Sequence, residues 1–242
     1  MCLQDRKDDL NLQGVCVFCG SSPGADGAYL EAARELGHAI AKRGLTLVYG
    51  GGDVGLMGEL ASAATHERGK VIGVIPRFLS AKVGHVSGSE VYEVDTMHER
   101  KAKMYGLSDA CIAMPGGLGT LEEISEAVNW VQLGLHDKPV GLLNVRDYFG
   151  NLIRFFDHAV SQRFLRVEHR DMLVIDDDPG ELLNRMIGFR SPHVENDFLV
   201  HDQFVVQAQV VTVGIELLLI ERFDDNVLAQ LRFDFFAREN HR

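Results

Sequence analysis

Short, mostly apolar runs alternate with longer segments of helical periodicity along the first 190 residues. The runs indicate strands at 15–19, 45–49, 70–75, 90–94, 110–114 and 139–143. Apolar residues that recur every three or four positions predict helices at 26–43, 55–68, 96–107, 120–134, 147–161 and 179–187. Because regular alternation of strand and helix is typical of a parallel sheet with helices on both faces, we predict an α/β fold with a doubly wound, mostly parallel sheet.

The chain changes character at both ends of this alternating region. Residues 1–13 are polar and mixed in charge, and we expect them to form a tail ahead of a single α/β domain at 14–190. The region 191–242 is rich in Val, Leu, Ile and Phe and alternates over 211–220, which predicts one or two strands and then a short amphipathic element. It is expected to be a C-terminal extension, to which the sequence assigns no role.

A glycine-rich turn joins a predicted strand to a helix start that carries carboxylates, at Pro115–Glu123. Its glycines let backbone N–H groups approach an anion, and the helix start adds unpaired donors and the positive end of its dipole. A phosphate is therefore expected at 116–120. A helix cap is the alternative, since Thr120 and Glu123 have the spacing of a capping box.

Two further glycine-rich turns follow predicted strands. Gly50–Gly58 has the spacing of the dinucleotide fingerprint, but the acidic residue expected about 20 positions later is missing around Lys70–Val74. A mononucleotide is thus favoured over NAD. The third turn is Cys19–Pro23, and such turns gather at the carboxyl edge of a parallel sheet, where ligands bind. The residues expected to line the nucleotide site are Ser21, Gly51 and Gly52.

A basic pair lies near the start of another predicted helix. Thr96 and Glu99 have capping-box spacing, which places Arg100 in the second turn of the helix 96–107. The alternative for Arg100 and Lys101 is a solvated basic face, because most charged helix residues lie on the surface.

These segments resemble the LONELY GUY (LOG) family, the cytokinin riboside 5′-monophosphate phosphoribohydrolases often mislabelled as lysine decarboxylases. The family's PGGxGTxxE motif is complete at Pro115–Glu123 and its Met-His-x-Arg-Lys motif at Met97–Lys101, and the resemblance covers about Gly14 to Glu195. It implies a Rossmann-like fold, a homodimer, no metal or redox cofactor, and Arg100 and Glu123 as the catalytic pair. The residues expected to bind substrate and phosphate are Ser21, Gly51, Gly52, Met97, Lys101, Gly116, Gly117, Leu118, Gly119 and Thr120.

Composition favours a cytoplasmic enzyme that acts on a small molecule. The chain has 242 residues, of which 46% are hydrophobic and 24% charged, enough for one α/β domain with a substantial core. It has no apolar run of about 20 residues to span a membrane and no apolar signal region in residues 1–13. A formal net charge of −11 without a basic run disfavours nucleic acid as a partner.

The cysteines are expected to be reduced and structural. Cys16 and Cys19 have CxxC spacing, but three residues apart on a strand they point to opposite faces, about 10 Å from each other. A disulfide or a shared zinc ion there is therefore not expected. The same reading applies to Cys2 and Cys111.

The predicted reaction is hydrolysis of the N-glycosidic bond of a nucleoside 5′-monophosphate to a free base and ribose 5-phosphate. Its transition state is cation-like, and a carboxylate such as Glu123 stabilises it more than the neutral substrate. The helix start and Arg100 are both expected to favour the ionised form of Glu123. The alternatives are a broader AMP or pyrimidine nucleotide nucleosidase and a non-catalytic nucleotide or molybdenum cofactor binding protein. A carrier would need no carboxylate beside the sugar.

Overall fold

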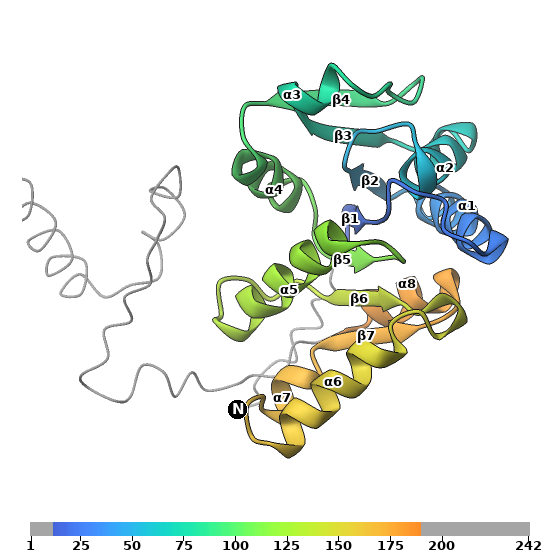
Figure 1. The fold of residues 1–242 in the computed structure, drawn as a ribbon. Coiled ribbons are helices and arrows are strands. Elements are labelled where there is room, and N and C mark those ends of the chain that lie inside the picture. The colour runs from blue at the N-terminus through green and yellow to red at the C-terminus, as the bar shows by residue number, and fades with distance from the viewer. Residues whose placement is uncertain (1–11, 190–242) are drawn as a thin grey trace, which may run out of the picture. The chain divides into compact units, whose positions relative to one another are not determined.

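The computed structural model describes residues 12–189, so the expected extension 191–242 lies outside the described residues. The strands are β1 Gly14–Phe18, β2 Thr46–Tyr49, β3 Val71–Pro76, β4 Glu90–Val94, β5 Ala110–Ala113, β6 Val140–Leu143 and β7 Leu173–Asp176 (Figure 1). The helices are α1 Gly27–Lys42, α2 Gly55–His66, α3 Arg77–Ser80, α4 Met97–Gly106, α5 Leu118–Gln132, α6 Gly150–Ser161, α7 Val167–Arg170 and α8 Pro179–Ile187, with a 3-10 turn at Val145–Asp147.

The seven strands form one parallel sheet in the order β4-β3-β2-β1-β5-β6-β7. The chain builds outward from β1 to β4 and then returns to the other side of β1 with β5. The order therefore reverses between β1 and β5, and in open α/β sheets ligands bind at the carboxyl ends of the strands at such a reversal. The turns after β1 and β5 are two of the glycine-rich turns singled out in the sequence.

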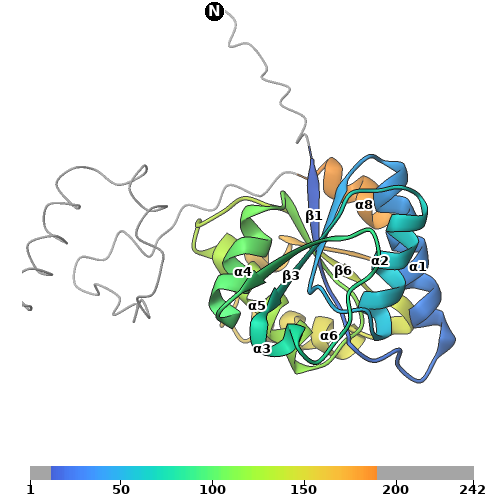
Figure 2. The ribbon, with the colours of Figure 1, turned by 90° about the horizontal axis from the view of Figure 1, so that it is seen from above.

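Helices cover both faces of the sheet, as Figure 2 shows, with α1, α2 and α8 on one side and α4 and α5 on the other. Alternate side chains of each strand enter the two cores: Val15 and Val17 of β1 pack with α1 and α2, whereas Cys16 and Phe18 pack with α4 and α5. All five residues of β1 are buried, as expected of a central strand covered on both faces. The Rossmann-like α/β fold predicted from the sequence is confirmed.

The six predicted strands are all present, and one strand was missed. β7, Leu173–Asp176, ends in an acidic residue and runs directly into two more, so its apolar run is only three residues long and lacks the glycine-rich boundary that follows β1, β2 and β5. Cys16, Cys19 and Cys111 are free and buried, and Cys16 and Cys19 face opposite cores as predicted. Cys2 lies outside the described residues.

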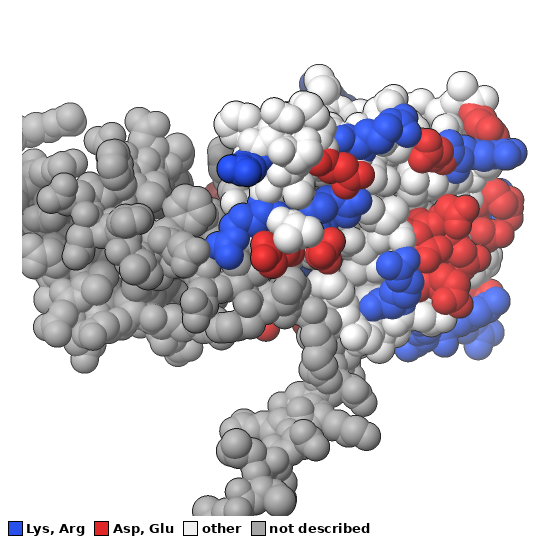
Figure 3. All heavy atoms as spheres, turned by 90° about the horizontal axis from the view of Figure 1, so that it is seen from below, with Lys and Arg blue, Asp and Glu red and all other residues white. Residues whose placement is uncertain are grey.

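The surface of the described domain is mixed in charge. On the face in Figure 3, acidic and basic side chains lie interspersed, and acidic ones gather at one side. Within residues 12–189, no helix combines the length and apolarity needed to cross a membrane. The same residues hold no group of three or more His, Cys, Asp or Glu side chains arranged for a metal ion.

Candidate active site

Helix α5 begins two residues earlier than the sequence predicts, at Leu118, and its N-cap is Gly117. The first helical bond runs from the N–H of Leu121 to the carbonyl of Gly117, at 3.1 Å. Thr120 therefore lies inside the first turn and is 4% exposed, while Glu123 lies in the second turn and is 6% exposed. The predicted capping box at Thr120 and Glu123 is wrong, because the glycine turn itself starts the helix. Glu123 is a buried carboxyl group with no capping role.

Thr120 explains part of the glycine pattern. A Cβ atom on Gly116 would lie 2.1 Å from the Thr120 hydroxyl oxygen, so only glycine fits against that side chain. Around Gly117 and Gly119 a Cβ atom would meet no heavy atom within 4 Å. Gly117, Leu118 and Gly119 are exposed. The N–H groups of the first helical turn have no partner within their own helix, so this turn offers donors on an accessible surface.

Helix α4 begins at the predicted capping interactions. The Thr96 hydroxyl accepts a bond from the Glu99 N–H at 3.1 Å, and the Glu99 carboxylate accepts one from the Asp95 N–H at 2.9 Å. This start directs Arg100 inward, where its Nε donates to the Val74 carbonyl at 3.2 Å. Only 13% of the Arg100 side chain is exposed, so a solvated basic face is the wrong interpretation of this residue.

The guanidinium of Arg100 on α4 forms an ion pair with the carboxylate of Glu123 on α5. Its Nη1 lies 3.5 Å from Glu123 Oε1. The backbone of Gly50 makes room for it, since a Cβ atom there would lie 2.3 Å from Arg100 Nη2. The sequence singles out Gly50 only as part of a nucleotide fingerprint. Its contact with Arg100 joins segments far apart in the chain, and no local pattern reports it.

The three glycine-rich turns interlock through their backbones. The N–H of Gly20 donates to the Pro115 carbonyl at 3.0 Å, and the Gly20 carbonyl accepts from Leu56 at 3.1 Å. Gly55 has a φ of +59°, and a Cβ atom there would lie 2.3 Å from the carbonyl carbon of Ser21. The turns after β1, β2 and β5 thus form one continuous surface. Of the predicted lining residues, Ser21 is exposed on it, whereas Gly51 and Gly52 are buried.

Arg100 pairs with Glu123, whereas the neighbouring Lys101 pairs with two other carboxylates of α5. Its Nζ bonds to Glu122 at 2.5 Å and to Glu126 at 3.0 Å, which ties α4 to α5. Lys101 is 8% exposed, so it is not part of a solvated face either. Burial lowers the pKa of Lys101, but the two carboxylates outweigh it and raise the pKa overall. Met97, the other predicted binding residue of α4, is 37% exposed at the start of that helix.

Burial dominates the electrostatics of Glu123. Loss of hydration raises its pKa from 4.5 to about 7, although the positive charge of Arg100 lowers it. The sequence predicted that Arg100 favours the ionised form of Glu123, and this effect is present. The prediction that the ionised form is favoured overall is wrong, because burial raises the pKa more than Arg100 lowers it. A carboxyl group with a pKa near 7 exists in both protonation states at neutral pH, which suits a group that exchanges or counters charge during a reaction.

The arrangement brings a buried carboxyl group and a turn with unpaired N–H donors to the same sheet edge. The Glu123 carboxylate is held by Arg100, and the start of α5 places several N–H donors close by in the chain. A substrate with a phosphate group and a centre that becomes positively charged would use both features. A phosphorylated sugar that passes through a cation-like transition state fits that description.

Comparisons with known proteins agree with this interpretation. The sequence model of a family described as "possible lysine decarboxylase" matches residues 57–186. A probable cytokinin riboside 5′-monophosphate phosphoribohydrolase of Oryza sativa subsp. japonica, LOGL2, is 50% identical over 74% of this chain and 74% of its own length. The cytokinin riboside 5′-monophosphate phosphoribohydrolase LOG3 of Arabidopsis thaliana is 47% identical over 74% of this chain and 84% of its own.

A solved structure shares the fold at lower identity. The molybdenum cofactor binding protein of the phototrophic bacterium Rippkaea orientalis superposes with a TM-score of 0.53 and is 26% identical. The similarity covers 74% of this chain and 96% of that one.

Proposed function

The chain belongs to the LOG family of cytokinin riboside 5′-monophosphate phosphoribohydrolases, and from this membership we propose that it releases a cytokinin base from its nucleotide. The bond broken joins the base nitrogen to C1′ of ribose 5-phosphate. Water supplies a hydroxyl group to C1′ and a proton to the departing base. The observation that carries the proposal is the buried pair of Arg100 and Glu123, which lies near the glycine-rich turn at the start of α5.

In the proposed mechanism, Glu123 counters the positive charge that develops on the ribose as the bond breaks. An ionised carboxylate stabilises that charge more than it stabilises neutral substrate, which is the condition for lowering the barrier. Its raised pKa is a consequence of the same burial that strengthens the interaction, because charges attract more strongly where water is excluded. The ionised form predominates once the pH exceeds about 7.

Arg100 is proposed to orient Glu123 and to hold an oxygen atom of the ribose or the phosphate. Its guanidinium stays charged at all relevant pH values and carries several donors in a fixed plane. Its Nε donates to the Val74 carbonyl, and its Nη1 forms an ion pair with the Glu123 carboxylate. The remaining donors are free to meet substrate in this proposal.

The 5′-phosphate is proposed to bind the turn at 116–120, with Ser21, Gly51, Gly52 and Met97 lining the nucleotide site. Glycine is required at 116 by the Thr120 side chain, and the exposed N–H groups after it lie at the positive end of α5. Lys101 is also proposed to bind substrate. Its contacts with Glu122 and Glu126 support a second role, in holding α4 against α5.

A matched pair of substrates tests the proposed function. We expect N6-isopentenyladenosine 5′-monophosphate to be cleaved and the corresponding riboside, which lacks only the phosphate, to be cleaved at a rate lower by about a hundredfold or more. Without its phosphate the ligand loses the charge-assisted bonds that position its sugar. Release of free base from each is measured by chromatography. Equal rates on the two compounds would assign the glycine turns another purpose.

The same reaction could be specific for N6-modified adenine or could extend to other bases. Broader cleavage of AMP or pyrimidine nucleotides by the same pair of residues is the second candidate. The approximately 50% identity to relatives named for cytokinin nucleotides favours the N6-modified adenine. A panel of nucleoside monophosphates, compared by kcat/KM, ranks the two.

We further propose a homodimer, with the face of α5 and α6 as its interface. Large apolar side chains are exposed there: Phe155 of α6 is 61% exposed, and Phe164, three residues after the end of α6, is 89% exposed. A groove of about 300 Å³ runs between the two helices and is lined by Val128, Phe156 and both exposed phenylalanines. Contiguous exposed apolar surface of this kind marks interaction sites, and a second copy would cover it.

Sedimentation equilibrium tests the dimer with a charged substitution. Phe164→Glu is expected to raise the dimer dissociation constant about a hundredfold or more. In a two-fold symmetric dimer each subunit loses the burial of one phenylalanine and places a charge in the interface. Phe164 is so exposed that its replacement costs the single subunit little. Phe78→Glu, in α3 and 52% exposed, is the control expected to leave the dimer intact. A monomeric wild-type protein at micromolar concentration would refute the proposal.

A further inference from the structure

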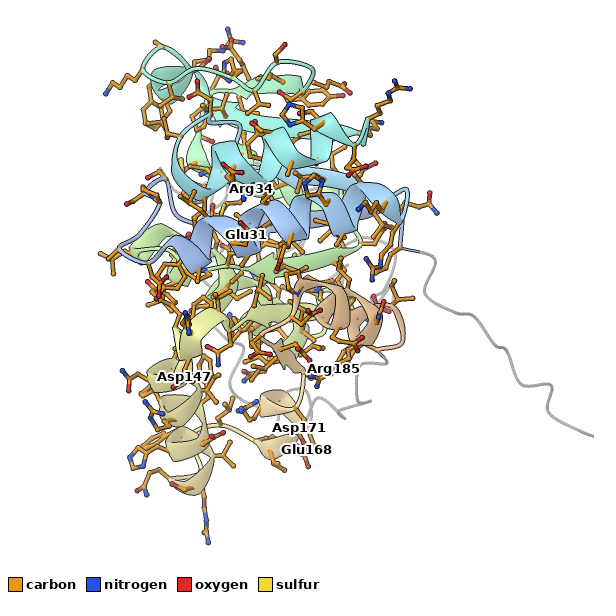
Figure 4. The ribbon with its side chains drawn as sticks, turned by 90° about the vertical axis from the view of Figure 1, so that its right-hand side faces the viewer. Glu31, Arg34, Asp147, Glu168, Asp171 and Arg185 are labelled. Atoms are coloured by element: carbon orange, nitrogen blue, oxygen red, sulfur yellow. The ribbon has the colours of Figure 1, made fainter. Side chains whose placement is uncertain are left out.

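A strained turn leads from β6 into α6. Arg146 and Asp147 have positive φ values of 53° and 55°, although neither is glycine. The side chain of Asn144 holds the turn, accepting a bond from the Phe149 N–H at 2.8 Å and donating one to Asp147 at 3.2 Å. Figure 4 shows Asp147 where the turn enters α6. Residues other than glycine persist in this backbone conformation where the surrounding structure requires it, and such positions cluster at functional sites.

The turn delivers Tyr148 to the proposed phosphate site. The Tyr148 hydroxyl donates a hydrogen bond to the Gly116 carbonyl at 2.5 Å. Its ring packs edge-on against Tyr29 of α1, with ring centroids 5.7 Å apart, and against Phe149 at 5.1 Å. Arg146 lies 3.7 Å from Asp26, the N-cap of α1, so the turn is braced from two sides. Tyr148 itself remains 42% exposed.

The hydrogen bond from Tyr148 to the Gly116 carbonyl fixes the orientation of the whole peptide unit between Gly116 and Gly117. The peptide unit between Gly116 and Gly117 is planar and trans, so its C=O and N–H groups point in opposite directions. Holding the carbonyl of Gly116 toward Tyr148 therefore aims the N–H of Gly117 away from it. Two successive glycines otherwise leave this peptide free to rotate as a unit, since neither has a side chain to restrict it. A bond at the carbonyl also polarises the peptide and strengthens its N–H as a donor.

We propose that Tyr148 is a positioning residue for the reaction, whose hydroxyl holds the Gly116–Gly117 peptide in the orientation that binds the 5′-phosphate of the substrate. This inference rests on the proposed function, and it adds a residue outside the recognised motifs. Tyr148 acts on the phosphate through the peptide and has no direct part in breaking the glycosidic bond.

The test removes one oxygen atom and measures binding apart from turnover. Tyr148→Phe is expected to weaken binding of ribose 5-phosphate, followed by calorimetry, about five- to tenfold, in keeping with the loss of one hydrogen bond. The KM for N6-isopentenyladenosine 5′-monophosphate should rise by a similar factor, with kcat changed less than about twofold. Tyr29→Phe removes the same atom from the neighbouring ring and is the matched control, expected to change neither value.

The outcomes separate this inference from the function on which it rests. If wild-type protein binds ribose 5-phosphate and folded Tyr148→Phe protein binds it equally well, the role of Tyr148 is refuted and the proposed function stands. A fall in kcat with unchanged ribose 5-phosphate affinity would also refute it, because a positioning effect on phosphate must appear in binding. Wild-type protein that neither binds ribose 5-phosphate nor cleaves the nucleotide would overturn both proposals.

Discussion

Glu123→Gln is expected to lower kcat on N6-isopentenyladenosine 5′-monophosphate about a hundredfold or more, equivalent to about 2.7 kcal/mol of transition-state stabilisation. The substitution preserves the shape of the side chain and removes its charge. Steady-state release of free base measures the effect. Glu122→Gln is the matched comparison: its side chain is 56% exposed and bonds to Lys101, and we expect a much smaller loss. Near-normal turnover by a folded Glu123→Gln protein would transfer the carboxylate role to Glu122 or Glu126.

The stability of the same variant provides an independent readout. Because the pKa of Glu123 is about 7 in the folded chain and 4.5 ordinarily, its burial costs stability that is absent below about pH 4.5 and is complete above about pH 7. Glutamine mimics the protonated form, so at pH 8 the variant should gain up to about 3 kcal/mol in free energy of unfolding. Near pH 4.5 the two proteins should be equally stable. A helix cap would instead predict a loss of about 1 kcal/mol.

Arg100→Ala is expected to lower turnover by about a hundredfold or more as well. The variant loses the group that orients Glu123 and leaves that carboxyl group buried without its counter-charge, which raises its pKa further. The pH dependence of kcat/KM should therefore shift upward. Arg34→Ala is the control, because Arg34 on α1 pairs at the surface with Glu31 (Figure 4) and also with Glu59. It should retain normal turnover.

The double variant tests whether the pair works as one unit. If Arg100 acts chiefly through Glu123, combining Arg100→Ala with Glu123→Gln should be scarcely worse than the poorer single variant. If the two residues contributed independently, the fold losses in turnover of the two single variants would instead multiply. Multiplied losses would mean that Arg100 stabilises the transition state by its own contact with substrate.

Local patterns in the sequence predicted the parts of the site that depend on one segment at a time. The strands before each glycine-rich turn, the cap at Thr96 and the helix that carries Arg100 follow from spacing that is visible within a dozen residues. Spacing alone left the inward direction of Arg100 open, and the family resemblance favoured it. The alternating order of strands and helices also predicts that these turns meet at one edge, and the order of the sheet agrees.

The features that were missed depend on contacts between distant segments or on a balance of opposing effects. The spacing of Thr120 and Glu123 suggested a cap, but the preceding glycines already begin the helix at Leu118. The charge of Arg100 was visible in the sequence, whereas the degree of burial that outweighs it was not. Tyr148 follows an ordinary apolar strand, and only the folded chain brings its hydroxyl to Gly116.

The most direct test of the central claim is the product balance from N6-isopentenyladenosine 5′-monophosphate incubated with purified wild-type protein. Chromatography of the base and an enzymatic assay of ribose 5-phosphate are run on the same samples, with Glu123→Gln protein alongside. We predict one ribose 5-phosphate for every free base from the wild type and almost none from the variant. Release of inorganic phosphate and the intact riboside, or no free base at all, would contradict the account.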